Sequence, residues 1–151
     1  MKIALASDHG GFSLKKQIMA FLEEQSITYK DFGTDSEASV DYPDFALAAA
    51  EAVAAGECDL GIICCGTGIV VSMVANKVPG IRAALCHDTF SARMSREHND
   101  ANILTMGERV IGPGLALEVV QAFLTGKYAG GRHARRVAKI REVENKYCGP
   151  K

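Results

Sequence analysis

The chain has 151 residues, of which 48% are hydrophobic and 23% are charged. This length and composition predict one globular domain with a hydrophobic core and exclude a disordered chain. Lys and Arg number 17 and Asp and Glu number 18, so the net charge is near −1, which argues against a general nucleic-acid or membrane-surface binder. No apolar run approaches the roughly 18 residues that span a bilayer. Asp8 and His9 come too early in the sequence for a signal peptide.

Short apolar runs alternate with amphipathic segments in the first half of the chain. Residues 2–6 predict a strand that leads into the polar sequence Ser7-Asp8-His9-Gly10-Gly11. A helix is expected next, because apolar residues recur at helical spacing at Leu14, Ile18, Phe21 and Leu22. The elements expected after it are a strand over 27–32, a polar loop over 34–42, and an Ala-rich helix that starts near Pro43 and ends at Gly56.

The second half continues the alternation. Residues 59–65 (DLGIICC) are almost all apolar, which is typical of a strand buried on both faces. The elements expected after it are a helical run from Gly68 through Lys77, a strand over 81–86, a helix over 88–98, a strand over 102–106 and a helix over 115–124. This order predicts a three-layer α/β/α sandwich with a five-stranded parallel, Rossmann-like (flavodoxin-like) sheet. No linker or repeat interrupts it, so we expect a single domain over 1–151.

The C-terminal segment differs from the rest. After Gly130-Gly131, residues 132–147 predict a helix with a narrow apolar side and a basic side. A charged helix of this kind is typical of a segment that packs on a second subunit, and a solvated terminal helix is the alternative. Arg132 and Arg136 are four residues apart and share a helix face, so they suit a phosphate dianion. A solvated basic face is the alternative for this pair.

The five cysteines contain no C-x-x-C pair, and their odd number cannot be fully paired within one chain. We therefore expect reduced thiols and a cytoplasmic location. Cys64 is interpreted as a core residue. Cys65 precedes Gly66-Thr67-Gly68 at a strand-to-helix turn, where backbone N–H groups favour an anion, so it is a candidate base or nucleophile. Val71 stands where a dinucleotide fingerprint needs Gly and where a thiol phosphatase needs Arg, so neither motif fits.

Polar groups follow several of the expected strands, where ligands bind in open parallel sheets. These groups are Asp8 and His9 after the first strand, Cys65 to Gly68 after the third, His87 and Asp88 after the fourth, and Glu108 and Arg109 after the fifth. We also expect His98-Asn99-Asp100, which precede the fifth strand, to join this cluster; a helix C-terminal cap is the alternative for His98. The spacing of His9, His87 and His98 matches no metal-ligand signature, so we expect no metal site.

Taken together, these residues resemble the type B ribose-5-phosphate isomerases and the related galactose-6-phosphate isomerase subunits. The resemblance covers nearly the whole chain. The motifs that carry it are Ser7-Asp8-His9-Gly10-Gly11, Val40-Asp41-Tyr42-Pro43-Asp44, Cys65-Gly66-Thr67-Gly68 with Ala75-Asn76-Lys77, the segment 95–102 (SREHNDAN), and Gly130-Gly131-Arg132-His133. Each motif alone is weak, but together in this order they are specific.

The resemblance implies isomerisation of an aldose phosphate to a ketose phosphate through a cis-enediolate, with no metal or other cofactor. It implies that Cys65 moves the proton between C2 and C1 and that Thr67 passes the hydroxyl proton. His98, with Asp8, would open the sugar ring. Backbone N–H donors to the enediolate are implied at Gly66, Gly68, Ile69 and Val70. The other substrate-binding residues that it implies are His9, Tyr42, Asn99, Arg109, Arg132 and Arg136.

The family also places its site between two subunits. The resemblance therefore implies a homodimer or a dimer of dimers, in which residues 130–151 contact the partner and the partner supplies the groups around His98 and the tail arginines. A monomer would be nearly inactive. Ribose 5-phosphate and ribulose 5-phosphate are the expected substrate pair. A six-carbon sugar 6-phosphate (allose or galactose 6-phosphate) and an unphosphorylated aldose are the alternatives within the class.

One position departs from the family pattern. Val70 stands where the family usually has Gly. A valine with positive φ would be an outlier, so we expect Val70 to adopt helical geometry in the first turn of the following helix, with its N–H available. Val70 would then narrow the pocket and affect which substrate fits.

The element pattern alone leaves other classes of protein open, because fold does not fix function. A receiver-like binding module would need a phospho-acceptor Asp where Cys65 stands. A flavodoxin-like module would need a Ser/Thr-rich phosphate loop where the chain has Asp8-His9-Gly10-Gly11. A third alternative is an inactive relative kept as an interaction subunit, and the presence of Cys65, His98 and Arg132 argues against it.

Overall fold

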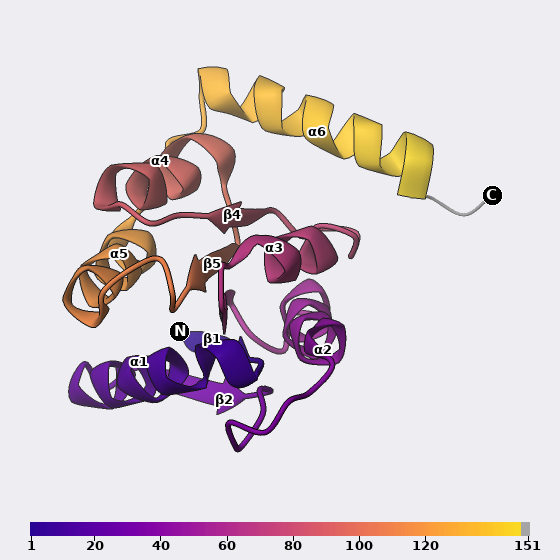
Figure 1. The fold of residues 1–151 in the computed structure, drawn as a ribbon. Coiled ribbons are helices and arrows are strands. Elements are labelled where there is room, and N and C mark those ends of the chain that lie inside the picture. The colour runs from indigo at the N-terminus through magenta and orange to yellow at the C-terminus, as the bar shows by residue number, and fades with distance from the viewer. Residues whose placement is uncertain (149–151) are drawn as a thin grey trace.

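A computed structural model describes residues 1–148 as a parallel sheet with helices on both faces (Figure 1). The strands are β1 (Lys2–Ser7), β2 (Thr28–Asp31), β3 (Leu60–Cys65), β4 (Ala83–Leu85) and β5 (Ile103–Gly107). All pairings are parallel, in the order β2-β1-β3-β5-β4. The predicted α/β sandwich is therefore confirmed. The last two strands exchange places relative to the flavodoxin order 2-1-3-4-5, which puts β5 beside β3.

Two helical layers cover the sheet, and a sixth helix extends past it. The helices are a 3₁₀ turn η1 (His9–Gly11), α1 (Phe12–Glu24), α2 (Tyr42–Ala54), α3 (Ile69–Ala75), α4 (Thr89–Asn99), α5 (Pro113–Thr125) and α6 (Arg132–Cys148). One core cluster lies between the sheet and α1, α4 and α5, and the other lies between the sheet and α2 and α3. Figure 1 shows α6 starting next to α4 and running past the β4 edge of the sheet. Within residues 1–148, no helix combines the length and apolarity needed to cross a membrane.

Burial explains why β3 is the central strand. All six of its residues are buried, and β1 and β5 pair with its two sides. Gly61 is required inside it, because a Cβ there would lie 2.9 Å from Cγ1 of Ile103. Small residues also shape α2, where Ala46, Ala49 and Ala50 are completely buried and let the helix lie close to the sheet.

The turn between β3 and α3 confirms the expectation for Val70. Val70 is the second residue of α3, and the left-handed conformation is taken by Gly68, with φ of +77°. Among the described residues, Ser26 and Asp100 are the only non-glycines with positive φ. The N–H of a first-turn residue such as Val70 has no acceptor within its own helix.

Gly68 should be far more sensitive to substitution than its φ alone implies. A Cβ on Gly68 would lie 2.5 Å from Cδ1 of Leu85 and 2.7 Å from the carbonyl carbon of Met106. We expect Gly68→Ala to lower the free energy of unfolding by about 2–4 kcal/mol, because strain and overlap add. Denaturant unfolding measures this.

Gly56→Ala is the matched control. Gly56 has φ of +74° but open space around it, so its substitution should cost only about 1 kcal/mol of backbone strain. Equal losses of stability in the two variants would contradict the close packing inferred at Gly68.

Candidate active site

The end of β3 meets the end of β1 at the carboxyl edge of the sheet. Ser7 pairs with Cys64, so Asp8 and Cys65 leave the two strands side by side. The η1 turn then lies directly on β3, since a Cβ on Gly11 would be 2.5 Å from the carbonyl carbon of Cys64. The structure therefore brings the first and third predicted motifs together.

Main-chain contacts hold Cys65 on both sides. Its side chain is almost completely buried, and its Sγ accepts a hydrogen bond from the N–H of Gly68 at 3.0 Å. The N–H of Glu108 donates to the carbonyl of Cys65 at 2.9 Å. The loop after Cys65 rests on Gly107, where a Cβ would lie 2.4 Å from the carbonyl carbon of Thr67. The sulfur of Cys65 therefore has a fixed position at the start of the loop that leads into α3.

The neighbouring thiols have a different character. Cys64 is completely buried in the cluster beneath α1 and α5, and burial raises the pKa of its thiol far above the usual range. Burial likewise raises the pKa of Cys86 to about 11. Both thiols stay protonated near neutral pH, as expected for core residues. The structural interpretation of Cys64 is confirmed.

Other predicted residues surround this loop. Asp8 is buried, and its Oδ1 accepts the N–H of Gly11 at 3.1 Å. The Arg109 side chain lies over Gly66, whose Cβ position would be 3.5 Å from Cδ and Nε of Arg109. Nδ1 of His9 accepts the N–H of Val40 at 3.3 Å. That contact places the ring proton of neutral His9 on Nε2.

The remaining residues at this edge are partly or fully exposed. Tyr42 is the first residue of α2 and is 39% exposed. Oγ1 of Thr67 accepts the N–H of Ile69 at 3.3 Å, which caps the start of α3. Thr67 and Ile69 are exposed and Val70 is half-buried. We call the predicted residues at this end of the sheet the carboxyl-edge group: Asp8, His9, Tyr42, Cys65, Gly66, Thr67, Gly68, Ile69, Val70 and Arg109.

A second group lies where α4 ends and α6 begins. The imidazole of His98 stacks on that of His133, with ring centroids 4.2 Å apart and planes inclined by 6°. The N–H of Ala129 donates to the carbonyl of Glu97 at 2.9 Å, which fixes the loop that leads into α6. We call the predicted residues here the amino-edge group: His98, Asn99, Arg132 and Arg136.

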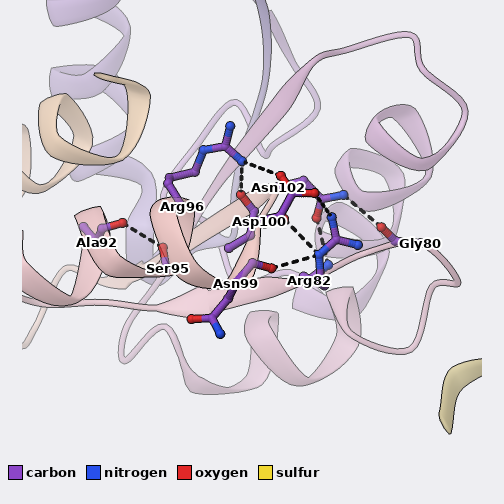
Figure 2. A network of polar contacts seen from close by, with 9 residues as sticks. Gly80, Arg82, Ala92, Ser95, Arg96, Asn99, Asp100 and Asn102 are labelled. Atoms are coloured by element: carbon purple, nitrogen blue, oxygen red, sulfur yellow. Dashed lines mark hydrogen bonds and ion pairs between the residues drawn. The ribbon is translucent and has the colours of Figure 1, made fainter. Parts of the chain in front are cut away.

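A polar network fixes the end of α4 (Figure 2). Asp100 has φ of +49° and ends the helix. Arg82 donates to the carbonyl oxygens of Asn99 and Asp100 at 3.2 and 2.9 Å and pairs with the Asp100 carboxylate at 2.9 Å. Arg96 lies 3.6 Å from the same carboxylate. Figure 2 shows the side-chain amide of Asn99 pointing away from this network, so it is left for other contacts.

The two groups do not meet within one chain. Asn102, which follows α4, joins the start of β3 through the hydrogen bond from the N–H of Gly61 to its carbonyl at 2.9 Å, whereas Cys65 ends β3. Four residues of a strand span about 13 Å. The expectation that His98-Asn99-Asp100 join the cluster at the strand ends is therefore wrong for a single chain. A helix that follows a parallel strand runs back, so its C-terminus lies at the opposite edge.

Sequence reasoning assigned no role to three residues here, although it placed His87 and Glu108 at the ends of strands. Nε2 of His87 accepts the N–H of Gly107 at 2.9 Å, and Oε2 of Glu108 accepts the N–H of Leu14 at 2.8 Å, so both side chains fix the backbone at the carboxyl edge. His133 was visible only as the neighbour of Arg132. Within residues 1–148, no three His, Cys, Asp or Glu side chains are grouped so as to hold a metal ion.

The sequence profile of the Ribose/Galactose Isomerase family matches residues 3–140. The chain belongs to this family. Family membership makes it an aldose–ketose isomerase. Ribose-5-phosphate isomerase B of Escherichia coli is 48% identical, covering 96% of this chain and 97% of the relative. A D-erythrulose-4-phosphate isomerase of Pectobacterium atrosepticum is 42% identical, covering 96% of each. Among solved structures, ribose-5-phosphate isomerase B of Clostridium thermocellum superposes with a TM-score of 0.96 at 59% identity, covering 97% of this chain and 99% of that one.

The His98–His133 stack should make stability depend on pH. Burial, followed by the charges of His98, Arg132 and Arg136, lowers the pKa of His133 below 6.5. Folding therefore favours the neutral ring, and this contribution is complete above about pH 6.5 and is lost as pH falls through the lowered pKa. We expect the free energy of unfolding to drop between pH 7.5 and 5.5, as measured with urea.

His133→Phe is the informative comparison, because phenylalanine keeps an aromatic ring against His98 and does not titrate. Its stability should fall less steeply over the same pH interval. Parallel curves for the two proteins would show that His133 does not contribute this dependence.

Proposed function

We propose that the protein interconverts ribose 5-phosphate and ribulose 5-phosphate through a cis-enediolate, with Cys65 as the base. The observation that supports this most directly is the position of Cys65 at the carboxyl end of a fully buried strand, beside Asp8, His9 and Arg109. In the proposed reaction the Cys65 thiolate removes the C2 proton of the open-chain aldose and becomes a thiol. It then returns the proton to C1, so the base is regenerated.

The negative charge that develops on the enediolate oxygens must be stabilised by hydrogen-bond donors. The backbone N–H groups at the start of α3, including that of Val70, have no acceptors within the helix. Each well-placed donor to such an oxyanion contributes about 3 kcal/mol. Thr67, exposed beside Cys65, moves the hydroxyl proton between O1 and O2 in this scheme. Asp8 assists opening of the sugar ring together with His98.

We propose that the site is shared between two copies of the chain. The carboxyl-edge group contains the base, but His98, Asn99 and the two tail arginines lie at the other edge of the same chain. A partner that presents its amino-edge group to the first copy's Cys65 completes the set. The exposed apolar side of α6 supports association, since Ile140, Val143 and Tyr147 are 47, 59 and 71% exposed. The assembly is a homodimer or a dimer of dimers.

In this arrangement His9 and Arg109 from one copy and Arg132 and Arg136 from the other bind the phosphate and hydroxyl groups. Arginine suits a phosphate dianion because its planar fork donates two parallel hydrogen bonds. Tyr42 lines the sugar pocket and Asn99 holds the sugar hydroxyls. The proposal includes a cytoplasmic location, which the five free cysteines favour.

The length of the sugar is the remaining question about the substrate of this isomerase. Val70 is half-buried in the first turn of α3, the helix that follows the Cys65 loop, and its side chain occupies space that a glycine would leave free. A six-carbon sugar 6-phosphate would need that space. We therefore favour a shorter sugar, and one relative is named for a four-carbon substrate, D-erythrulose 4-phosphate.

A coupled assay for ketose formation in the presence of EDTA tests the substrate, the base and independence from added metal. We expect turnover of ribose 5-phosphate, with less or none for allose 6-phosphate, galactose 6-phosphate, erythrose 4-phosphate and free ribose. Cys65→Ala should lower kcat/KM by about 10²–10⁴, the range of a general base.

Cys58→Ala is the matched control, because Cys58 is an equally buried cysteine that precedes β3 at its other end. It should keep wild-type kinetics. Activity that survives Cys65→Ala would remove Cys65 from the base role. Loss of activity with EDTA would overturn metal independence, and a lack of activity on every sugar would favour an interaction subunit.

The shared site makes a separate prediction. Cys65→Ala and His98→Asn, each nearly inactive alone, should regain activity when the two variants are mixed and allowed to exchange subunits. Random pairing makes half of the dimers mixed, and each mixed dimer has one intact site, so about a quarter of the wild-type sites return. Exchange is verified by native mass spectrometry. Mixed dimers without recovered activity would contradict a site shared in this way.

A further inference from the structure

Lys15 is a buried lysine that the proposed reaction does not use. It lies in α1 facing the sheet and is 1% exposed. Its Nζ donates to Oδ2 of Asp31 and to the carbonyl of Thr34, each at 2.6 Å. An ammonium group is costly to bury, and an apolar residue of similar volume often gives equal or greater stability. The position of this charge therefore calls for an explanation other than stability.

One partner of Lys15, Asp31, is the last residue of β2, and the other, Thr34, lies near the start of residues 33–41, the segment that leads from β2 to α2. Asp31 also accepts the N–H of Gly33 through Oδ1 at 2.8 Å, and the N–H of Thr34 donates to the carbonyl of Ser7 at 2.9 Å. The chain passes very close to β1 here, since a Cβ on Gly33 would be 2.4 Å from the nitrogen of Ser7. Lys15 thus holds this segment over the end of β1, one residue before Asp8.

The other end of the segment reaches the carboxyl-edge group. After Thr34, which is buried, residues 35–39 are exposed, so little packing holds them. Val40 then donates its N–H to Nδ1 of His9, and Tyr42 begins α2 two residues later. The path of residues 33–41 therefore sets where Val40 stands, and Val40 sets the ring orientation and tautomer of His9.

We propose that Lys15 is a positioning residue for substrate binding: by holding the Thr34 end of segment 33–41 it keeps Val40 on His9, and so keeps Nε2–H of His9 directed at the substrate. The link to substrate rests on the proposed function. The link from Lys15 to the segment and to His9 does not. Lys15 itself touches neither substrate nor the reacting atoms.

Lys15→Met tests this, because methionine has a similar length and is tolerated in a buried site, while Asp31 keeps access to water at 30% exposure. Two readouts require no activity. Hydrogen exchange at the amides of Thr34 and Val40 should accelerate about tenfold or more, the factor for losing a hydrogen bond to a charged donor. The ¹⁵N NMR signals of His9, assigned with a His9→Asn variant, should change from one Nε2–H tautomer to an averaged pair.

Lys30→Met is the matched control. Lys30 is next to Asp31 in β2, and its ion pair with Glu57, at 2.8 Å, is exposed. Its loss should leave both readouts unchanged. In the enzyme assay, Lys15→Met should raise KM for ribose 5-phosphate about tenfold, the factor for one lost hydrogen bond, and change kcat by less than about twofold. A loss of kcat without the rise in KM would mean that Lys15 has a structural role alone.

The outcomes separate the two proposals. Wild-type exchange and an unchanged His9 tautomer in a folded Lys15→Met protein would overturn the role of Lys15, whatever the enzyme's substrate. If the wild-type protein turned over no sugar, the proposed function would fail while the exchange and NMR results would still decide the positioning. If Lys15→Met did not fold, Asp31→Asn would be judged by the same readouts, since an amide can keep only one of the two contacts that Asp31 makes.

Discussion

The site depends on close backbone packing around the end of β3. Gly11 and Gly107 approach that end from either side, and a Cβ on either would lie within 2.4–2.5 Å of backbone atoms of the turn. The parallel register of β1, β3 and β5 brings the two glycines there. Because backbone meets backbone, the position of Cys65 is set by the sheet and not by side-chain packing. Changes to the side chains of the loop would therefore leave Cys65 in place.

The groups next to Cys65 show how the same region orients side chains. Backbone N–H groups donate to ring nitrogens of two histidines, His9 and His87, and thereby select their neutral tautomers. Glu108 is also engaged, because its carboxylate accepts the first-turn N–H of Leu14 in α1. A neutral imidazole has one acceptor nitrogen, and in both histidines a backbone N–H already occupies it, so neither ring is free to accept a proton there. Glu108 and Cys65 each receive one backbone N–H, which fixes their positions and leaves acceptor capacity on both.

Much of the fold and of the candidate site could be predicted from the hydrophobic pattern of the sequence. The predictions that were wrong have physical causes. Strands and helices follow from local periodicity, but the exchange of β4 and β5 arises from long-range pairing that no local pattern encodes. Asp8, His9, Arg109 and residues 65–68 of the carboxyl-edge group were found because they follow strands, whereas Tyr42, Ile69 and Val70 came only from the family resemblance. His98 and Asn99 of the amino-edge group were expected at the wrong edge of their own chain, although the direction of a crossover helix was enough to correct this. Lys15 was overlooked even though it shares helical spacing with Ile18 and Leu22, which are completely buried.

The separation of the two groups has a consequence for how activity can be controlled. The network of Arg82, Arg96 and Asp100 stabilises the end of α4 within each chain, so the backbone at His98 and Asn99 is already held before any partner arrives. Little ordering entropy would then be lost when a second copy supplies His98 to a neighbouring Cys65. Association itself, more than rearrangement within a chain, would complete the site. If the site is shared as proposed, association through the apolar side of α6 would set how much active enzyme is present at a given protein concentration.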